Sequence, residues 1–157
     1  MQSHSRQFYL LSLVLCTALF AGEKGPTSFI DGTWKLNAAK SDGGPRGLPD
    51  NLSIKVTTKG PEFEGLQNVD RAEVLLKFRS DGKETVNPLP NDVEMRAKHR
   101  VENGAVLAEY RIIIPGQGEF TQIDRITVSA DGKVLTNERE VKTGQGNFKQ
   151  KMIFDRQ

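Results

Sequence analysis

The stretch 93–114 constrains the fold more than any other part of the chain, because its residue order specifies a β-hairpin. Small or apolar residues and His99 fall on every second position as far as Val101, and charged residues fill the gaps. This period-2 pattern is typical of a half-buried strand. Asn103-Gly104 follows, a dipeptide that tolerates the positive φ angles of a two-residue type I′ turn. The sequence therefore predicts antiparallel sheet joined by tight turns.

The turn determines which residues of the hairpin lie opposite each other. On the other face it sets Lys98 against Glu109, an opposite-charge pair that disfavours a slip by one residue. The pairs expected on the inward face are Val101 with Val106, His99 with Ala108, Ala97 with Tyr110, Met95 with Ile112 and Val93 with Ile114.

Alternating runs predict further strands on the N-terminal side of this hairpin. The first covers 29–36, with Trp34 in the core, and a Gly- and Pro-rich loop follows over 37–50. A loop of that length is frequently a lid or a binding loop. A turn at Asp81-Gly82 would set Arg79 against Glu84. The other expected strands lie around 52–57, 62–66, 72–78 and directly after Asp81-Gly82.

Charge determines the register of the last three strands. With Asp131-Gly132 as the tip of a hairpin, Asp124 faces Arg139, whereas a slip by one residue would oppose Asp124 to Glu138. Directly opposed like charges destabilise a sheet, so the first register is favoured. The hairpin predicted from the turn at 143–146 shares a strand with this one, and both registers place the same side of that strand toward the interior. Asp124, Asn137 and Arg139 are therefore predicted on one inner face.

These patterns indicate an all-β domain. About ten short strands follow each other with turn signals between them, and no segment has helical apolar periodicity. The expected fold is an antiparallel up-and-down meander of about 8–10 strands, closed as a β-barrel over 23–157. Closure is favoured because it removes exposed sheet edges.

The N-terminus has the pattern of a secretory signal peptide over 1–22. A short segment with Arg6 precedes an apolar run over 8–21, which is shorter than the roughly 20 residues that a membrane-spanning helix needs. We expect cleavage after Ala18 or Ala21, and a secreted or periplasmic protein. Lipid attachment at Cys16 is disfavoured because bulky Leu15 precedes it.

Composition excludes several classes of function. The only cysteine lies in the leader, so the mature chain is expected to have no disulfide, and a single remaining histidine argues against a zinc site. The net charge of +2 falls to about +1 when the leader with Arg6 is removed, which gives no field for nucleic acid or for membranes. No cofactor motif and no phosphate loop is present. The oligomeric state is left open.

Three segments resemble a known superfamily. Gly32-Thr33-Trp34-Lys35-Leu36 resembles the opening strand of the calycins, the lipocalins and fatty-acid-binding proteins, where Gly-x-Trp closes one end of the barrel. Together with 129–136 and Phe154-Asp155-Arg156, the run 33–42 looks like uncharacterised secreted lipocalin-like proteins of bacteria. The resemblance implies a lipocalin-like barrel with Gly32, Trp34 and Arg156 in structural roles. It implies that Arg156, or as the second candidate Arg139, packs over Trp34.

The chain departs from the fatty-acid-binding proteins at two places. Those proteins hold a carboxylate with an Arg-x-Tyr pair on the final strand, where this chain has Phe154-Asp155-Arg156. They also carry a helix pair after the first strand, where this chain has its Gly- and Pro-rich loop. These departures argue against a fatty acid as the specific ligand.

The predicted inner face mixes polar and apolar residues, and two interpretations follow. Asp124 and Arg139 could satisfy each other at a hydrated end of the barrel, or the polar residues could form the polar end of a ligand cavity. In the second case Arg139 would hold an acid or carbonyl group. The candidate ligand-binding residues are His99, Tyr110, Asp124, Arg139, Asn137 and Met95.

The leading hypothesis is a secreted, non-catalytic barrel that binds a small, partly apolar or amphipathic molecule. A structural or protein-interaction barrel with a filled interior and a contact loop over 37–50 is the alternative. A cavity enzyme, an isomerase or hydrolase using His99 and Asp124, is the third hypothesis. An inner cavity of about 300 Å³ or more, reached by Arg139 or His99, would favour binding.

Overall fold

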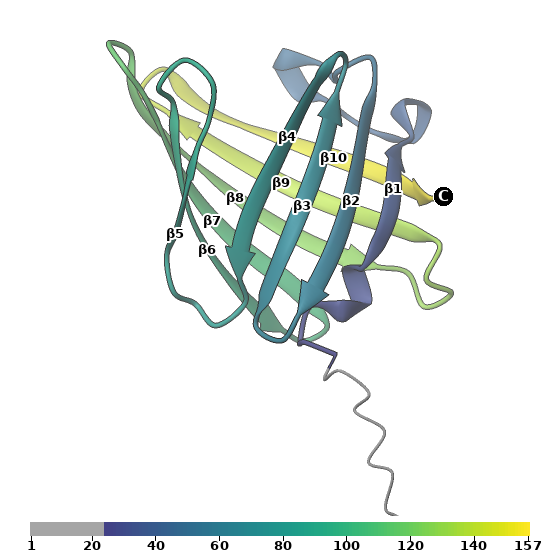
Figure 1. Ribbon diagram of the computed structural model, residues 1–157. Coiled ribbons are helices and arrows are strands. Elements are labelled where there is room, and N and C mark those ends of the chain that lie inside the picture. The colour runs from purple at the N-terminus through teal and green to yellow at the C-terminus, as the bar shows by residue number, and fades with distance from the viewer. Residues whose placement is uncertain (1–23) are drawn as a thin grey trace, which may run out of the picture.

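The computed structural model describes residues 24–157, which form ten antiparallel strands (Figure 1). The signal peptide predicted over 1–22 lies outside the described residues. Within them, no helix has the length and apolarity needed to span a membrane. The strands are β1 (Gly32–Leu36), β2 (Leu52–Lys59), β3 (Glu62–Val69), β4 (Ala72–Arg79), β5 (Thr85–Pro88), β6 (Glu94–Glu102), β7 (Ala105–Ile114), β8 (Gly118–Val128), β9 (Val134–Thr143) and β10 (Gly146–Arg156). Short 3₁₀ turns are η1 (Ser28–Ile30), η2 (Ala38–Lys40) and η3 (Gly44–Arg46).

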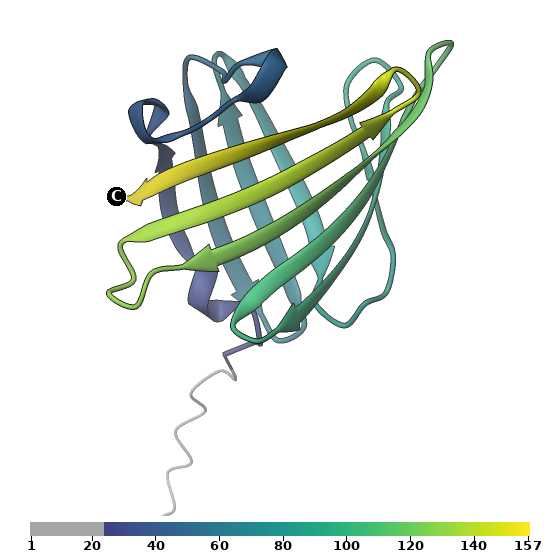
Figure 2. The ribbon, with the colours of Figure 1, turned by 180° about the vertical axis from the view of Figure 1, so that it is seen from behind.

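A single sheet of all ten strands curls into a barrel. Its spatial order is β4-β3-β2-β1-β10-β9-β8-β7-β6-β5, so the first and last strands of the chain are neighbours. Trp34 on β1 lies opposite Arg156 on β10. From behind, β6–β10 form one wall that crosses the wall made by β1–β4 (Figure 2). The predicted all-β, antiparallel barrel is confirmed.

The barrel has one seam without a backbone ladder, between β4 and β5. The side chain of Asn87 on β5 spans this seam. Its Oδ1 accepts from the backbone N–H of Lys77 at 2.8 Å, and its Nδ2 donates to the backbone oxygen of Lys77 at 3.0 Å. Asn87 is buried, so one amide side chain replaces part of the missing ladder.

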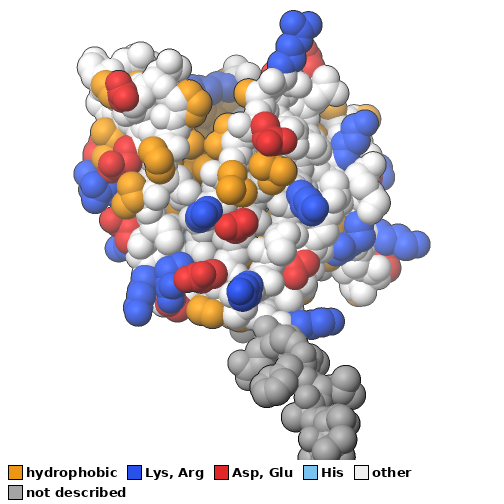
Figure 3. Space-filling model, in the orientation of Figure 1, with side chains coloured by type: hydrophobic (Ala, Val, Ile, Leu, Met, Phe, Trp, Pro, Cys, Tyr) orange, Lys and Arg blue, Asp and Glu red, His pale blue; other side chains and the backbone are white. Residues whose placement is uncertain are grey.

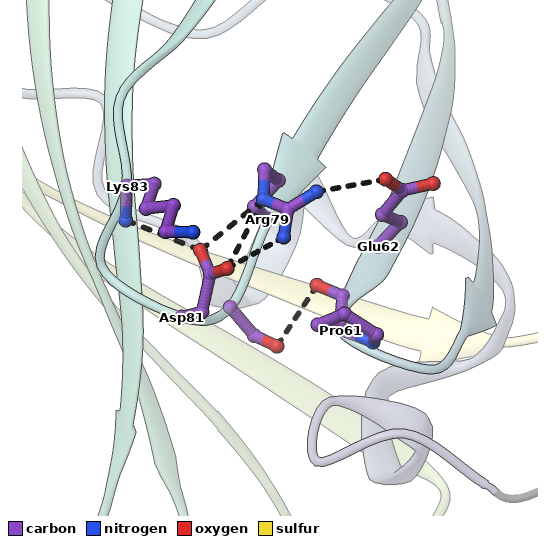
Figure 4. A network of polar contacts seen from close by, with 6 residues as sticks. Pro61, Glu62, Arg79, Asp81 and Lys83 are labelled. Carbon is purple, nitrogen blue, oxygen red and sulfur yellow. Dashed lines mark hydrogen bonds and ion pairs between the residues drawn. The ribbon is translucent and has the colours of Figure 1, made fainter.

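The prediction that Arg79 meets Glu84 across a β4–β5 hairpin is wrong. Arg79 bonds instead to Glu62 on β3 at 2.8 Å and to Asp81 at 2.6 Å (Figure 4). The hydrogen bond from Arg79 holds the pKa of Asp81 below its usual value. Arg79 lies directly opposite Glu62 in the β3–β4 ladder, whereas β4 and β5 are not paired, so Glu84 is out of its register and pairs with Arg96 at 3.4 Å.

The long hairpins have the predicted registers. Asn103 and Gly104 adopt φ of 50° and 72°, and the β6–β7 pairs follow the prediction from Val101 and Val106 outward to Met95 and Ile112. The ladder itself begins one residue inside the expected Val93–Ile114 pair. β8–β9 and β9–β10 also have the registers predicted from charge. The inner face of β6–β10 is therefore confirmed.

The first strand is shorter than predicted, since 28–30 form the turn η1. Ile30 is buried in the barrel core, and the indole Nε1 of Trp34 donates to its backbone oxygen at 2.8 Å. The guanidinium carbon of Arg156 lies 4.1 Å from the centre of the Trp34 ring. Gly32, with φ of 132°, leaves room for that guanidinium, because a Cβ there would collide with Nη1. Arg156 rather than Arg139 thus occupies the position over Trp34.

The 37–50 loop is fastened to β10. Asp42 and Lys151 exchange backbone hydrogen bonds at 2.8 and 2.9 Å, and Nε2 of Gln150 donates to the oxygen of Gly43 at 2.8 Å. The loop contains two single 3₁₀ turns and no longer helix. It therefore forms a fixed cover at one end of the barrel, where Leu48 and Pro49 reach inward over a cavity.

The core is concentrated around Trp34, Phe63, Phe78 and Phe154, all less than a tenth exposed. Acidic and basic side chains are interspersed over the face seen in Figure 3, and the surface is hollowed near its upper edge, where hydrophobic side chains lie in the depth.

Candidate functional site

A cluster of polar side chains lies inside the barrel on four adjacent strands. Strands β6 to β9 each contribute from the inward face, and the contributors are His99, Tyr110, Asp124, Asn137 and Arg139. Asp124 and His99 are 1% and 2% exposed, and Asn137 is 7% exposed. Neighbouring registers bring these residues together: His99 pairs with Ala108, which pairs with Asp124, which pairs with Arg139. The cluster is therefore a direct product of strand register.

Asp124 is the centre of the cluster. Its Oδ1 accepts from Nε of Arg139 at 3.0 Å, and its Oδ2 accepts from Nη2 of Arg139 at 2.9 Å and from Nδ2 of Asn137 at 2.8 Å. This fork geometry is the strong form of an Arg–carboxylate pair. Burial lowers the pKa of Arg139, but the charge and hydrogen bonds of Asp124 outweigh burial and raise it overall. Arg139 is therefore cationic, and it forms a salt bridge with the Asp124 carboxylate.

His99 and Tyr110 form a second, uncharged pair. Nε2 of His99 lies 3.1 Å from the Tyr110 hydroxyl, and the rings of Phe63 and Phe78 lie 5.1 and 4.4 Å from the imidazole. Burial lowers the pKa of His99 to about 4, so the ring is neutral at pH 7. Burial, aided by the charge of Asp124, raises the pKa of Tyr110, which keeps its hydroxyl protonated.

His99 and Asp124, the two residues of the enzyme hypothesis, are not hydrogen-bonded to each other. The hydrogen bond of His99 goes to Tyr110, while Asp124 is occupied by Arg139 and Asn137. In the same part of the chain, 24–157, no group of three or more His, Cys, Asp or Glu side chains is placed to hold a metal ion. The arrangement can bind and orient a polar group, with positions set by the sheet.

Two buried polar atoms of the cluster have no hydrogen-bond partner within 24–157: Oδ1 of Asn137 and Nδ1 of His99. The orientation of the Asn137 amide follows from chemistry, because a carboxylate only accepts hydrogen bonds and so must face Nδ2. Oδ1 is consequently left as a free acceptor. Unsatisfied buried polar atoms are costly, and sites that bind polar ligand groups are one place where they occur.

The cluster borders two cavities. An inner cavity of about 90 Å³ has His99, Tyr110, Asp124, Asn137 and Arg139 on one side. A second, of about 230 Å³, lies beneath Leu48 and Pro49 at the covered end of the barrel. The residues common to the linings of both are Ile54, Gln67, Asn137, Arg139 and Phe154. The inner cavity alone is smaller than the roughly 300 Å³ at which ligand pockets typically begin, and only the two cavities together reach that size.

Most of the predicted binding residues line the inner cavity, but Met95 does not. Met95 packs against the apolar core away from both cavities. The opposite wall was not anticipated from the sequence, although the alternation in β3 contained a signal for it. The residues of that wall are Ile54, Val56, Phe63, Gly65, Gln67 and Phe78.

Comparison with known proteins identifies the fold. No family model and no curated protein matches the chain. Among solved structures, lipid binding protein 8 of Caenorhabditis elegans aligns with a TM-score of 0.64 and 12% identity, over 85% of this chain and 99% of that one. The SAHS protein of Ramazzottius varieornatus aligns with a TM-score of 0.64 and 16% identity, over 82% and 96%.

A third similar structure is the zebrafish ileal bile acid-binding protein in complex with cholic acid. It aligns with a TM-score of 0.59 and 17% identity, over 83% of this chain and 100% of that one. The alignments cover almost the whole of each of these proteins. The chain therefore has the calycin fold, in the form of a barrel like that of the lipid- and bile-acid-binding proteins it resembles.

Proposed function

We propose that the protein is a secreted barrel that binds one small, partly apolar molecule without transforming it. The observation that carries the proposal is the mixed lining of the barrel interior. Phe63, Phe78 and Phe154 provide apolar surface, and Asn137 and Arg139 provide hydrogen-bonding groups shared by both cavities. A few polar groups in an apolar pocket are typical of sites for small molecules.

The similar structures support an apolar ligand. Their names state that they bind lipids in one case and bile acids in another. The polar end here is built differently from a carboxylate site, because the cationic Arg139 is already paired with Asp124. Secretion is supported by the sequence pattern of 1–22.

A filled barrel that serves as a structural or interaction module is the second candidate. The observation in its favour is the small volume of the inner cavity, about 90 Å³. Ligand binding would need the inner cavity and the 230 Å³ cavity beneath Leu48 to act as one space. Arg139 and Gln67 line both cavities, so their long side chains are the ones that must adjust.

The decisive experiment is native mass spectrometry of the protein purified from the organism that makes it. We expect a retained molecule of low mass in the wild-type protein and its loss in Gly65→Val. A Cβ at Gly65 would stand 3.9 Å from Phe78 and 4.0 Å from Ile54, so the strand accepts it and the added methyls occupy the inner cavity.

Asn68→Val is the matched control, since Asn68 is exposed on the same strand and receives the same side chain. It should keep the retained molecule. If wild-type protein carries no small molecule and Gly65→Val unfolds at lower denaturant concentration, the added methyls overpack an interior that is already filled, and the structural module is the better description.

A further inference from the structure

If the barrel binds a small molecule as proposed, the charge at the polar end of the inner cavity determines which head group it accepts. Among the described residues that line the inner cavity, Arg139 is the only cation, and Nε and Nη2 of its guanidinium are both bonded to Asp124. The Asp124 carboxylate is 1% exposed and fully engaged by Arg139 and Asn137. The polar end of the cavity therefore has no net charge.

A ligand carboxylate would be poorly accommodated there. It would bring a second negative charge close to Asp124 in a buried space, where like charges repel strongly and desolvation of an ion is costly. A fork with Arg139 would have to use Nη1 and the remaining hydrogen of Nη2, and Asp124 already compensates the charge of that guanidinium. The cavity thus disfavours the anionic group that a cation in an apolar barrel would otherwise attract.

A neutral hydroxyl group matches the groups that remain. Oδ1 of Asn137 is a buried acceptor without a partner in the described chain, and Nδ1 of His99 is a second buried polar atom in the same state. Both residues line the inner cavity. Asn137 and Arg139 are two residues apart on β9, so their side chains lie on one face of the strand. A hydroxyl can donate to Oδ1 of Asn137 and accept from a neighbouring N–H at once.

We propose that the barrel selects neutral, hydroxyl-bearing apolar molecules over carboxylates of the same chain length. Asp124 is the specificity-determining residue, because it compensates Arg139 from inside and leaves the Asn137 oxygen as the free hydrogen-bonding group. The selectivity is opposite to the one that Arg139 alone would produce. The chemical basis of this selectivity is the Asp124–Arg139 salt bridge, which compensates the charge of Arg139 without a ligand.

The test compares 1-octanol with octanoate by isothermal titration calorimetry at pH 7, after removal of any retained molecule. The two probes have the same number of carbons and differ in the charged group. We expect 1-octanol to bind at least about tenfold more tightly, since a buried uncompensated charge is the larger cost. Gly65→Val should abolish binding of 1-octanol, which locates it in the inner cavity.

Asp124→Asn removes the compensating charge with little change of shape. In this variant the preference should reverse, so that octanoate gains affinity relative to 1-octanol. Glu138→Gln is the control, because Glu138 lies on the outer face of β9, half-exposed and 4.0 Å from Lys151. It removes the same charge from the protein and should leave the octanol-to-octanoate ratio unchanged.

The outcomes separate this inference from the binding function itself. Octanoate binding as tightly as 1-octanol to the wild-type protein overturns the head-group selectivity and leaves a binding barrel. Absence of binding by both probes overturns the two proposals together. If Asp124→Asn does not fold, the ratio measured with the wild-type protein decides the matter alone.

Discussion

The side-chain amide of Asn87 makes to Lys77 both of the backbone hydrogen bonds that a neighbouring strand would make. Oδ1 accepts from the Lys77 N–H at 2.8 Å and Nδ2 donates to its oxygen at 3.0 Å. An amide side chain carries one donor and one acceptor on a planar group, as a peptide unit does. Asn87 can therefore stand in for a peptide at the seam between β4 and β5.

We predict that Asn87→Ala destabilises the protein by about 1–3 kcal/mol, because the backbone N–H and oxygen of Lys77 lose their partners at the part-buried seam. The free energy of unfolding in urea measures this loss. Hydrogen exchange at the Lys77 amide should accelerate with it. The exposed Asn68→Ala is the control, and an equal effect in both variants would contradict the role assigned to Asn87.

Removing either partner of the Asp124–Arg139 pair should be costly. Asp124→Ala leaves Arg139 without compensation while its side chain is only 26% exposed, and breaking such a pair costs about 3–5 kcal/mol. We expect the double variant Asp124→Ala/Arg139→Ala to be less destabilised than the sum of the single variants. A double-mutant cycle in urea measures the coupling energy. Strict additivity of the two free-energy changes would show that the interaction between Asp124 and Arg139 does not stabilise the fold.

His99 should make stability depend on pH. Its pKa is lowered by burial from 6.5 to about 4 in the folded protein, so the unfolded chain binds more protons between these values. The contribution of neutral His99 to the free energy of unfolding is fully present above pH 6.5 and is lost as the pH falls toward 4. At about 1.4 kcal/mol per pKa unit the full effect is of the order of 3 kcal/mol. Urea unfolding of wild-type protein and His99→Gln across this range measures it, and parallel curves would be the contrary result.

Arg156 should be sensitive to replacement by lysine. The guanidinium stacks on Trp34, its Nε donates to the oxygen of Gly132 at 2.5 Å, and its Nη1 donates to that of Asp31 at 2.7 Å. A lysine cannot fork in this way, so we expect Arg156→Lys to cost about 1–2 kcal/mol. Trp34 is the only tryptophan, and its fluorescence should change with the substitution. Arg125→Lys on the outer face should leave both quantities unaltered.

Processing of the N-terminus is a separate prediction. Intact-mass measurement of protein exported by a bacterial host should show a mature chain that begins after Ala18 or Ala21. Cys16→Ser should give the same mature mass and yield, because no lipid is expected on this residue. A mature protein that retains Cys16 with an added acyl mass would overturn this prediction and indicate a lipoprotein.

Sequence patterns predicted the wall of β6–β10 well, because charge and alternation act there between strands that are adjacent in the chain. The pairing of Asp124 with Arg139 followed from two turns, Asp131-Gly132 and 143–146. Register places both residues on one face, and a salt bridge between them then needs only suitable side-chain lengths.

Two features of the other half of the barrel, the β4–β5 seam and the cavity wall, could not be predicted from local patterns. Nothing local to Asp81-Gly82 distinguishes a hairpin from a connection that leaves two strands unpaired, and Asn87 reads as an ordinary strand residue. Gly65 and Gln67 lie across the cavity from Asn137, and only barrel closure brings them there. Cavity volume depends on rotamers of many side chains, which alternation does not specify.

The seam between β4 and β5 has a counterpart between β10 and β1. Around the barrel, neighbouring strands are also consecutive in the chain except at β10 and β1, which only hydrogen bonds join. Neighbouring strands are likewise joined by a backbone ladder except at β4 and β5, which the chain connects through 80–84. The covalent chain therefore joins the strands where the ladder is missing, and the ladder joins them where the chain does not. A proteolytic cut within 80–84 would thus leave that seam to side chains alone, whereas a cut in any hairpin turn would leave a ladder holding the barrel shut.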